Sequence, residues 1–524
     1  MQEVSEYYRF CPDRVDIKLS DAVCFGRRRA NYPYCQGCRF NDDEKAADGR
    51  IEPAEIRGGN ESTCHMSIET VFKAYDVRAT YPEPLNEEVA WRVGNASAQF
   101  FRESLPSAQR SAVDRLTVVV GRDMRKSSPT LAAALIEGVR ATGMGVIDVG
   151  MIDTSQIYFA VNHCEAAGGI QTTASHNPAH YNGFKICGRK GVPVGENSGL
   201  EDICRIAGKV SRHQAAHPGP LSRRDLETEY KGFIRKVVRP IKPLKVVIDA
   251  SNGMAGKWAP IIFGDLPKLT IKFLNTETHG EFVHEPNPLV DANLEQLRAG
   301  VARVGADFGV CFDGDADRCM LVDERAEIVR CDMLTALLAR YFLQKHPGST
   351  IVYDLRSSRV VGEEITRHGG TPKRERVGHA FMKKALADTN AVFGGELSGH
   401  FYFRDNFYCD SGMLALSHVL NVLSASDAPL SGLIAPLKRF WASGERNFET
   451  DDKDGTIERL ADTYGDARRD RLDGITIEYD DWWCNVRKSN TEPLLRLNLE
   501  ADSAELLEQR VAEVGRLLGK PVAH

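Results

Sequence analysis

One local order recurs along the chain and restricts what it can fold into: a short apolar strand, a loop of small or polar residues, and then a helix. The strands are predicted at residues 116–120, 245–249 and 350–353. Continuous apolar and β-branched runs are typical of strands buried on both faces, and strands that alternate with helices predict α/β domains. Three such segments predict three related α/β domains whose loops surround a central cleft, because ligand sites lie at the carboxyl ends of strands in such sheets.

The end of the chain follows a different pattern. Residues 475–479 and 494–499 alternate as half-buried strands do, and a final helix carries an apolar face from Leu506 to Leu518. This pattern predicts a smaller α+β domain that serves as a lid. With a Cys-rich extension at the start and a Pro-Gly-Pro boundary near residue 218, the expected parts are 1–65, 66–215, 216–325, 326–436 and 437–524.

Size and charge narrow the classes of function. A chain of 524 residues is too long for one core, and its net charge of -6 argues against a general nucleic-acid binder. No apolar run approaches the roughly 20 residues that span a bilayer, and the start has no signal-peptide pattern. Most cysteines are scattered singly. We therefore expect a cytoplasmic protein with no nucleic-acid or membrane partner.

Residues 172–178, Thr-Thr-Ala-Ser-His-Asn-Pro, form the first candidate site. A small-residue strand at 168–171 enters the loop, and Pro178 and the later Asn182-Gly183 pair exclude regular structure. The pattern predicts Ser175 on an exposed turn, where its hydroxyl could accept a phosphate. Serine, asparagine and proline also make turns without any chemistry, so this loop alone leaves both interpretations open.

A second loop, residues 313–318 (Asp-Gly-Asp-Ala-Asp-Arg), follows a strand at 308–312. Three carboxylates spaced two apart repel one another, and a divalent cation would relieve the repulsion. Asp313, Asp315 and Asp317 offer the oxygen ligands of magnesium, and a phosphorylated Ser175 would add a further ligand. A calcium-binding EF-hand is the alternative, but its sixth position needs glycine and holds Arg318 here.

Two further motifs, Gly-Gly-Glu-Leu-Ser-Gly-His at 394–400 and Arg-Lys-Ser-Asn-Thr-Glu-Pro at 487–493, follow these loops in order. Together the four motifs resemble the α-D-phosphohexomutase family, most closely its phosphomannomutase/phosphoglucomutase branch. The likeness runs from about Phe72 to the C-terminus. It implies an enzyme that interconverts hexose 1-phosphate and hexose 6-phosphate of mannose or glucose. Magnesium, a phosphoserine and a hexose 1,6-bisphosphate intermediate and primer are implied as well.

The resemblance also implies roles for individual residues. Lys185 is the first candidate for moving protons at the sugar hydroxyl, and His176 could serve instead as a hydrogen-bonding residue of its loop. Glu396 and Ser398 resemble ligands of adjacent sugar hydroxyls, although their motif could also be only a turn. The implied catalytic residues are Ser175, Lys185, His176, Arg78 and His400. The implied substrate-binding residues are Tyr75, Arg318, His379, Glu396, Ser398, Arg487, Ser489, Asn490, Thr491 and Arg496.

The last motif bears on the choice between related activities. A guanidinium fork with hydroxyl and amide donors suits a phosphate, so residues 487–491 are expected to hold the distal phosphate of the sugar, with Arg496 joining them or pairing with a carboxylate. Phosphoglucosamine mutases, the nearest alternative, typically have Arg-Pro-Ser-Gly-Thr-Glu-Pro, whereas this chain has Lys488 and Asn490. A catalytically silent sugar-phosphate sensor is the alternative from another class.

The opening strand and loop of the resemblance differ at one position. The family usually has a glycine directly after the arginine that is Arg78 here, and this chain has Ala79 instead.

The first 65 residues lie outside the resemblance. Cys35 and Cys38 have the spacing with which two thiolates hold one metal ion. Two of Cys11, Cys24 and Cys64 could complete a tetrahedral set, which predicts a structural zinc site. An iron–sulfur cluster, which also takes four thiolates, and the absence of any metal are the alternatives.

Overall fold

The computed structural model describes residues 8–11, 14–20, 68–107, 116–489 and 494–522. The chain divides into two compact units, residues 1–66 and 67–524. In the first unit the described residues form an antiparallel hairpin of β1 (Tyr8–Cys11) and β2 (Arg14–Ser20). The expected zinc ligands Cys24, Cys35, Cys38 and Cys64 lie outside the described residues, and so does the side chain of Cys11.

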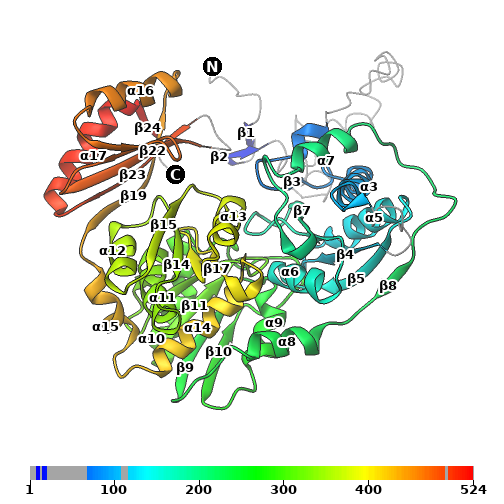
Figure 1. Ribbon diagram of the computed structural model, residues 1–524, viewed down its shortest axis with the longest axis horizontal. Coiled ribbons are helices and arrows are strands. Elements are labelled where there is room, and N and C mark those ends of the chain that lie inside the picture. The colour runs from blue at the N-terminus through cyan, green and yellow to red at the C-terminus, as the bar shows by residue number, and fades with distance from the viewer. Residues whose placement is uncertain (1–7, 12–13, 21–67, 108–115, 490–493, 523–524) are drawn as a thin grey trace. The chain divides into compact units, whose positions relative to one another are not determined.

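The second unit begins with a six-stranded mixed sheet in the order β3-β7-β6-β4-β5-β8 (Figure 1). Strands β4, β5, β6 and β8 run parallel, whereas β7 is antiparallel to both β6 and β3. The strands of this first domain are β3 (Val77–Thr80), β4 (Thr117–Arg122), β5 (Gly145–Met151), β6 (Gly168–Thr172), β7 (Tyr181–Gly188) and β8 (Leu221–Arg223). Its α-helices are α3 (Glu87–Glu103), α5 (Ser128–Arg140), α6 (Thr154–His163) and α7 (Leu200–Ala207). Ala79 takes a regular place on β3, paired with Asn182, so this position does not need glycine.

The second and third domains repeat one five-stranded topology. The sheet orders are β10-β9-β11-β12-β13 and β15-β14-β16-β17-β18, each with a parallel part followed by an antiparallel hairpin. The second domain contains α8 (Glu227–Arg235), β9 (Leu244–Asp249), α9 (Ala255–Phe263), β10 (Leu269–Leu274), α10 (Glu295–Val304), β11 (Phe308–Phe312), β12 (Cys319–Asp323) and β13 (Ile328–Val329). The third contains α11 (Cys331–Lys345), β14 (Thr350–Asp354), α12 (Arg359–Arg367), β15 (Thr371–Glu375), α13 (His379–Thr389), β16 (Phe393–Gly395), β17 (Phe401–Phe403), β18 (Cys409–Asp410), α14 (Gly412–Ser424) and α15 (Leu430–Ile434). The repetition agrees with the prediction of three α/β domains.

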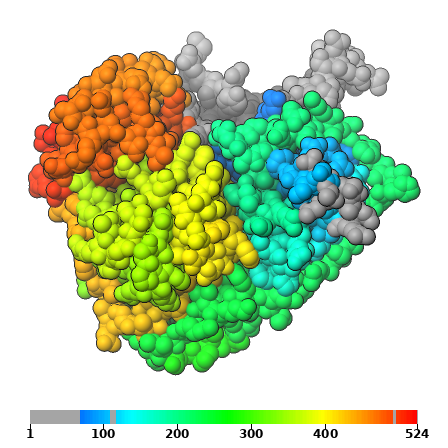
Figure 2. Space-filling view, in the orientation of Figure 1, coloured from blue at the N-terminus to red at the C-terminus, as the bar shows by residue number. Residues whose placement is uncertain are grey.

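Residues 441–522, orange to red in Figure 2, form a lobe with an antiparallel sheet in the order β20-β21-β22-β23-β19-β24. Its elements are β19 (Trp441–Glu449), α16 (Lys453–Thr463), β20 (Arg468–Asp470), β21 (Ile475–Glu478), β22 (Trp482–Lys488), β23 (Leu494–Ala501), α17 (Ala504–Leu518) and β24 (Lys520–Val522). Leu506, Leu507 and Val511 of α17 are only partly buried, while Val514 and Leu518 are fully buried against the sheet. The alternating strands and amphipathic helix read from the sequence therefore form this domain's core.

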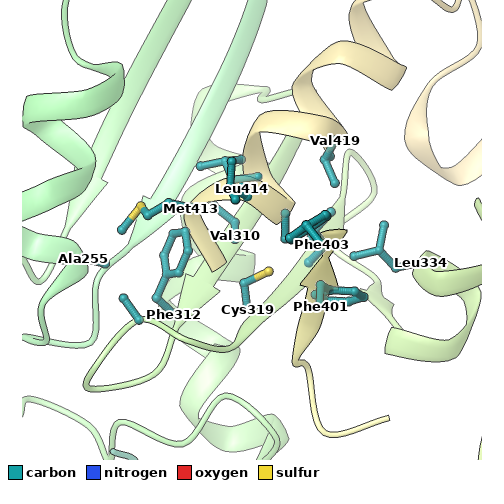
Figure 3. Close-up of a cluster of buried hydrophobic side chains, with 14 of the residues drawn as sticks. Ala255, Val310, Phe312, Cys319, Leu334, Phe401, Phe403, Met413, Leu414 and Val419 are labelled. Carbon is teal, nitrogen blue, oxygen red and sulfur yellow. The ribbon is translucent and has the colours of Figure 1, made fainter. Parts of the chain in front are cut away.

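One apolar core continues through the second and third domains and reaches one face of the first sheet. Helix α14 lies at its centre. Figure 3 shows Met413 and Leu414 of this helix beside Val310 and Phe312 of β11, with Phe403 of β17 on the other side. The C-terminal domain has a separate core. Because buried apolar packing resists separation, this core holds the first sheet against the second and third domains, although the first domain also has a core of its own. No helix within the described ranges is long and apolar enough to cross a membrane.

Two glycines allow helices α3 and α5 to touch through their backbones. A Cβ added at Gly138 would lie 2.0 Å from the Trp91 carbonyl oxygen, and one at Gly94 would lie 2.2 Å from that of Leu135. We predict that Gly138→Ala lowers the free energy of unfolding by about 1–3 kcal/mol, because backbone must move to admit the methyl group. Urea or thermal unfolding measures the change.

Gly232 on α8 is the matched control, since a Cβ there has no heavy atom within 4 Å. Gly232→Ala is expected to be neutral or stabilising by up to about 1 kcal/mol, the usual gain in helix propensity. If both substitutions shifted stability in the same direction and by the same amount, the close helix contact would not be what limits position 138.

Candidate active site

Three carboxylates meet in the loop between β11 and β12. Oxygen atoms of Asp313, Asp315 and Asp317 all lie within 4.8 Å of one another, and the three side chains are buried. Burial raises the pKa of Asp313, and the neighbouring Asp317 and Asp315 raise it further. Oδ1 of Asp315 and Oδ1 of Asp317 are buried without a hydrogen-bond partner among the described residues. A carboxylate cluster with unused oxygen atoms fits a divalent cation, and magnesium accepts such ligands.

Ser175 reaches this cluster from the loop between β6 and β7. Its Oγ donates a hydrogen bond of 2.7 Å to Asp313 Oδ2, which joins a loop of the first domain to a loop of the second. The expectation of an exposed turn is wrong, because Ser175 is only 1% exposed. The loop does turn sharply, with a φ of 50° at Ser175, but the acidic loop covers it. The contact is tight: a Cβ at Gly314 would lie 2.4 Å from the Ser175 carbonyl oxygen.

Arg125 holds the Ser175 loop in place. Its guanidinium is buried and donates to the carbonyl oxygens of Ser175 at 2.8 Å and of Asn177 at 2.7 Å. It also donates to those of Pro178 and Tyr181, while its Nε pairs with Asp123. Sequence reasoning missed this residue. It lies in the loop between β4 and α5, and only the fold shows which carbonyl oxygens it contacts.

Lys185 lies on β7 and points at the same carboxylates. Its Nζ donates to Asp315 Oδ2 at 2.8 Å and also pairs with Asp317. Burial opposes the charge on this lysine, but Asp315 and Asp317 outweigh it and raise the pKa of Lys185. The two carboxylates thus favour the ammonium form of Lys185 as long as no cation shares them.

His176 and Arg78 flank the serine. His176 Nδ1 lies 3.3 Å from Ser175 Oγ, and burial, together with Arg318 and Arg78, lowers the pKa of His176 well below its usual value. The imidazole is therefore neutral. Arg78 on β3 donates to Asn177 Oδ1 at 2.7 Å and pairs with Asp76. Both residues thus have a place beside the serine loop.

Arg318 and His400 meet at the far side of the acidic loop. The Arg318 backbone N–H donates to Asp313 Oδ1 at 3.1 Å, and its side-chain Nε donates to His400 Nε2 at 2.9 Å. His400 precedes β17 in the third domain, so the second and third domains meet here. His400 Nδ1 lies 3.8 Å from Asp317 Oδ1 and 2.8 Å from Asp410 Oδ2. Asp410 is not among the residues expected from the sequence.

The expected sugar-binding residues lie together in the third domain. Glu396 accepts hydrogen bonds from the Gly378 N–H at 3.0 Å and from Ser398 Oγ at 3.0 Å. His379 begins helix α13, and its ring lies 5.7 Å from that of Tyr75, which comes from the first domain. The structure therefore brings all four side chains to one loop region.

The expected phosphate clamp lies on the C-terminal sheet. Arg487 on β22 and Arg496 on β23 stand directly opposite each other, and Glu445 pairs with Arg487 at 2.6 Å and with Arg496 at 3.1 Å. The Ser489 backbone N–H donates to the Leu494 carbonyl oxygen at 2.9 Å, whereas Asn490 and Thr491 lie outside the described residues.

Arg356, which sequence reasoning also missed, lines a small cavity together with Leu397 of the sugar-binding loop and Asn498 of the C-terminal sheet. Its Nη2 pairs with Asp354 at 2.7 Å in the loop after β14. Burial opposes the charge on Arg356, but Asp354, followed by Glu396 and Glu445, raises its pKa. An arginine therefore stands within electrostatic reach of both the expected sugar ligand and the clamp.

Comparison with known protein families divides the chain in the same way. Four models of the phosphoglucomutase/phosphomannomutase family match it in order: alpha/beta/alpha domain I at residues 69–213, domain II at 229–326, domain III at 330–440 and the C-terminal domain at 445–517. The chain belongs to this family. The family predicted from the four sequence motifs is thereby confirmed.

Individual relatives of this mutase support the same family assignment. The phosphohexose mutases of Xanthomonas campestris pv. campestris (strain B100) are 38% identical over 457 residues, covering 85% of this chain and 98% of the relative. The phosphomannomutase of Escherichia coli K12 is 37% identical over 467 residues, covering 86% and 99%. A solved family member from Burkholderia thailandensis has a TM-score of 0.78 and 31% identity, covering 86% and 97%. The relatives thus span the chain from the first α/β domain to the C-terminal domain.

A test of the buried arginine follows from this geometry. We predict that Arg125→Lys lowers kcat by about 10- to 100-fold, because lysine keeps the charge but cannot serve four carbonyls with a rigid fork. A coupled mutase assay measures kcat. Lys126→Met is the control, since its exposed pair with Glu281 contributes at most about 1 kcal/mol. Unchanged turnover in Arg125→Lys would show that the loop holds its position without this contact.

Proposed function

We propose that this mutase interconverts the 1-phosphates and 6-phosphates of mannose and glucose, with Ser175 as the phosphoryl carrier. The 2.7 Å hydrogen bond between Ser175 Oγ and Asp313 is the observation that carries the proposal. It places a nucleophilic oxygen from the first domain on the carboxylate cluster of the second. Relatives named phosphohexose mutases and phosphomannomutase, at 38% and 37% identity, support the same reaction.

The metal expected at this cluster is magnesium. Asp313, Asp315 and Asp317 would hold it, together with an oxygen of the phosphorylated Ser175, and their unused oxygen atoms suit that task. When bound, the ion supplies charge that offsets the phosphoryl group and polarises it for transfer. Lys185 already neutralises part of the cluster through its pairs with Asp315 and Asp317.

The chemistry proceeds in two balanced transfers. In the first, the bond between Ser175 Oγ and phosphorus breaks while the free sugar hydroxyl forms a bond to the same phosphorus, giving a hexose 1,6-bisphosphate. The hydroxyl proton needs an acceptor, and His400 Nε2 is the candidate. Its single lone pair accepts from Arg318 Nε here, so it takes the proton only when Arg318 turns from the imidazole to the transferring phosphoryl group. In the second, Ser175 takes the other phosphate and the proton returns. A hexose 1,6-bisphosphate also serves as primer for an enzyme that has lost its phosphate.

The substrate is held at two places. Glu396 and Ser398 bind adjacent sugar hydroxyls, with Tyr75, His379 and Arg318 around them. Arg487, Ser489, Asn490, Thr491 and Arg496 hold the phosphate that is not being transferred. Because the bisphosphate must turn over between the two transfers, the contacts have to work in both orientations of the sugar. The C-terminal domain acts as the lid that loosens during this turn and closes again over a cleft between the domains.

The first test concerns Ser175 itself. We predict that Ser175→Ala lowers turnover by at least about 10³-fold even with bisphosphate primer present, because no other oxygen replaces the carrier. Intact-mass and peptide mapping of the unaltered protein should find phosphate on Ser175. Near-normal turnover in the variant would exclude the phosphoserine route, and wild-type protein without turnover on any hexose 1-phosphate would favour a silent sensor.

The second test concerns the sugar. Mannose and glucose differ only at C2, and Glu396 with Ser398 is expected to contact O3 and O4. We therefore predict catalytic efficiencies for the two 1-phosphates within about two decades, a gap of under roughly 3 kcal/mol. Steady-state kinetics on a panel that includes glucosamine 1-phosphate measures this. A discrimination of five decades would reveal an additional residue that recognises C2.

A further inference from the structure

A buried lysine stands behind the proposed proton acceptor. Lys383, on helix α13, is only 2% exposed. Its Nζ lies 2.8 Å from Asp410 Oδ1 and donates to the hydroxyl of Tyr158 at 2.8 Å. None of the steps described above uses this ammonium. Burying an unpaired charge costs several kcal/mol, so a lysine at such a place is retained only with an ionised partner.

Asp410 is that partner, and it uses both of its oxygen atoms. Oδ1 faces Lys383, and Oδ2 lies 2.8 Å from His400 Nδ1. Asp410 is 1% exposed and lies on β18, which pairs with β17 directly after His400. Burial opposes its charge, but Lys383 and then His400 hold the pKa of Asp410 well below its usual range. The carboxylate is therefore fixed between one cation and one imidazole.

The contacts of His400 determine which ring nitrogen carries the hydrogen. Arg318 Nε donates to His400 Nε2 at 2.9 Å, and a guanidinium has no acceptor atom. Nε2 therefore accepts this bond with its single lone pair, and the ring hydrogen is on Nδ1, 2.8 Å from Asp410 Oδ2. In enzymes that use histidine as a base, a carboxylate on the opposite nitrogen keeps the ring in the required tautomer. Asp410 stands in that place here.

We infer that Lys383 is a positioning residue of this mutase, which through Asp410 holds the His400 ring with Nε2 on the side of Arg318 and the acidic loop. The assignment rests on the proposed role of His400 as proton acceptor. Lys383 is suited to the task because it comes from another element, α13, and fixes the carboxylate oxygen that His400 does not use. Without it, Asp410 would lose the cation that fixes its orientation inside the core.

The contact with Tyr158 offers a different explanation for the burial of Lys383, and an experiment can distinguish it from the positioning role. Tyr158 belongs to α6 of the first domain, so Lys383 could serve only to dock the third domain against the first. Tyr158→Phe removes the hydroxyl but keeps the ring, which lies 4.1 Å from the ammonium, and leaves the pair with Asp410 intact. It is therefore the matched control for a docking role.

A double-mutant cycle with Lys383→Met, His400→Ala and both changes together tests the inference. With hexose 1-phosphate and bisphosphate primer, Lys383→Met is expected to lower kcat by about 10- to 100-fold, with KM within about threefold, as for other orienting partners. In the His400→Ala background the same change should cost less than about threefold, because the residue it positions is gone. Tyr158→Phe should keep kcat within about threefold. Thermal unfolding verifies that each variant is folded.

Other outcomes overturn the inference. Lys383 would be assigned to structure by any of three results. The losses of kcat from Lys383→Met and His400→Ala could multiply fully in the double variant, Lys383→Met could raise KM alone, or Tyr158→Phe could lose as much kcat as Lys383→Met. If Lys383→Met does not fold, Lys383→Arg, which keeps the cation, replaces it in the cycle. A loss of kcat from Lys383→Arg that is just as large in the His400→Ala background again contradicts the inference. If His400→Ala itself keeps wild-type kcat, the proposed role of His400 fails instead.

Discussion

The repulsion among three buried carboxylates is the constraint on which the active site depends. Asp313, Asp315 and Asp317 lie within 4.8 Å of one another with no water-exposed surface to relieve their charge. The cations that compensate them come from separate parts of the chain, Lys185 from β7 and Arg318 from the acidic loop itself. Because the compensation crosses the boundary between two domains, the docking of these domains is part of the catalytic arrangement. The shared apolar core of the first three domains keeps that docking fixed.

The far end of the site presents the opposite problem. Arg487 and Arg496 lie directly opposite each other on adjacent strands. Two like charges in such a cross-strand pair destabilise the sheet. Glu445 bridges them from a third strand, and it follows an irregularity of β19 between Ala442 and Glu445 that redirects the side chain. Arg356 adds a third guanidinium nearby. Arg356 is itself paired with Asp354, so Arg487 and Arg496 are the cations left for Glu445 and, in the proposed clamp, for a phosphate. Burial opposes the charge on Glu445, but Arg487 and Arg496 outweigh it and lower its pKa.

The sequence predicts those parts of the site whose chemistry is contiguous. Asp313, Asp315 and Asp317 are two residues apart, so their mutual repulsion, and the cation that relieves it, can be inferred without a fold. Arg125 could not be assigned in this way, because its four acceptors lie about fifty residues later in the chain. The burial of Ser175 was also missed. Ser175 is buried by the acidic loop, whose Asp313 comes 138 residues later in the chain. A loop with proline and asparagine is predicted to be exposed when the segment that packs over it is not known. Local pattern thus identified the α/β domains and the charged loops, whereas the contacts between domains needed the fold.

The contrast between two kinds of domain contact suits the proposed reaction, in which the bisphosphate has to turn within one site. The first three domains share an apolar core, and apolar packing resists separation. The third and fourth domains meet instead through polar groups. Arg374 pairs with Asp470 at 2.9 Å and with Glu478 at 3.2 Å, and the Arg359 backbone N–H donates to Glu500 at 3.1 Å. The pairs of Arg374 are partly exposed, and ion pairs of that kind contribute about 0–1 kcal/mol each, whereas Glu500 is buried. The serine, the acidic loop and His400 therefore lie on domains joined by apolar packing, while the proposed phosphate clamp lies on a domain that contacts the third through polar groups.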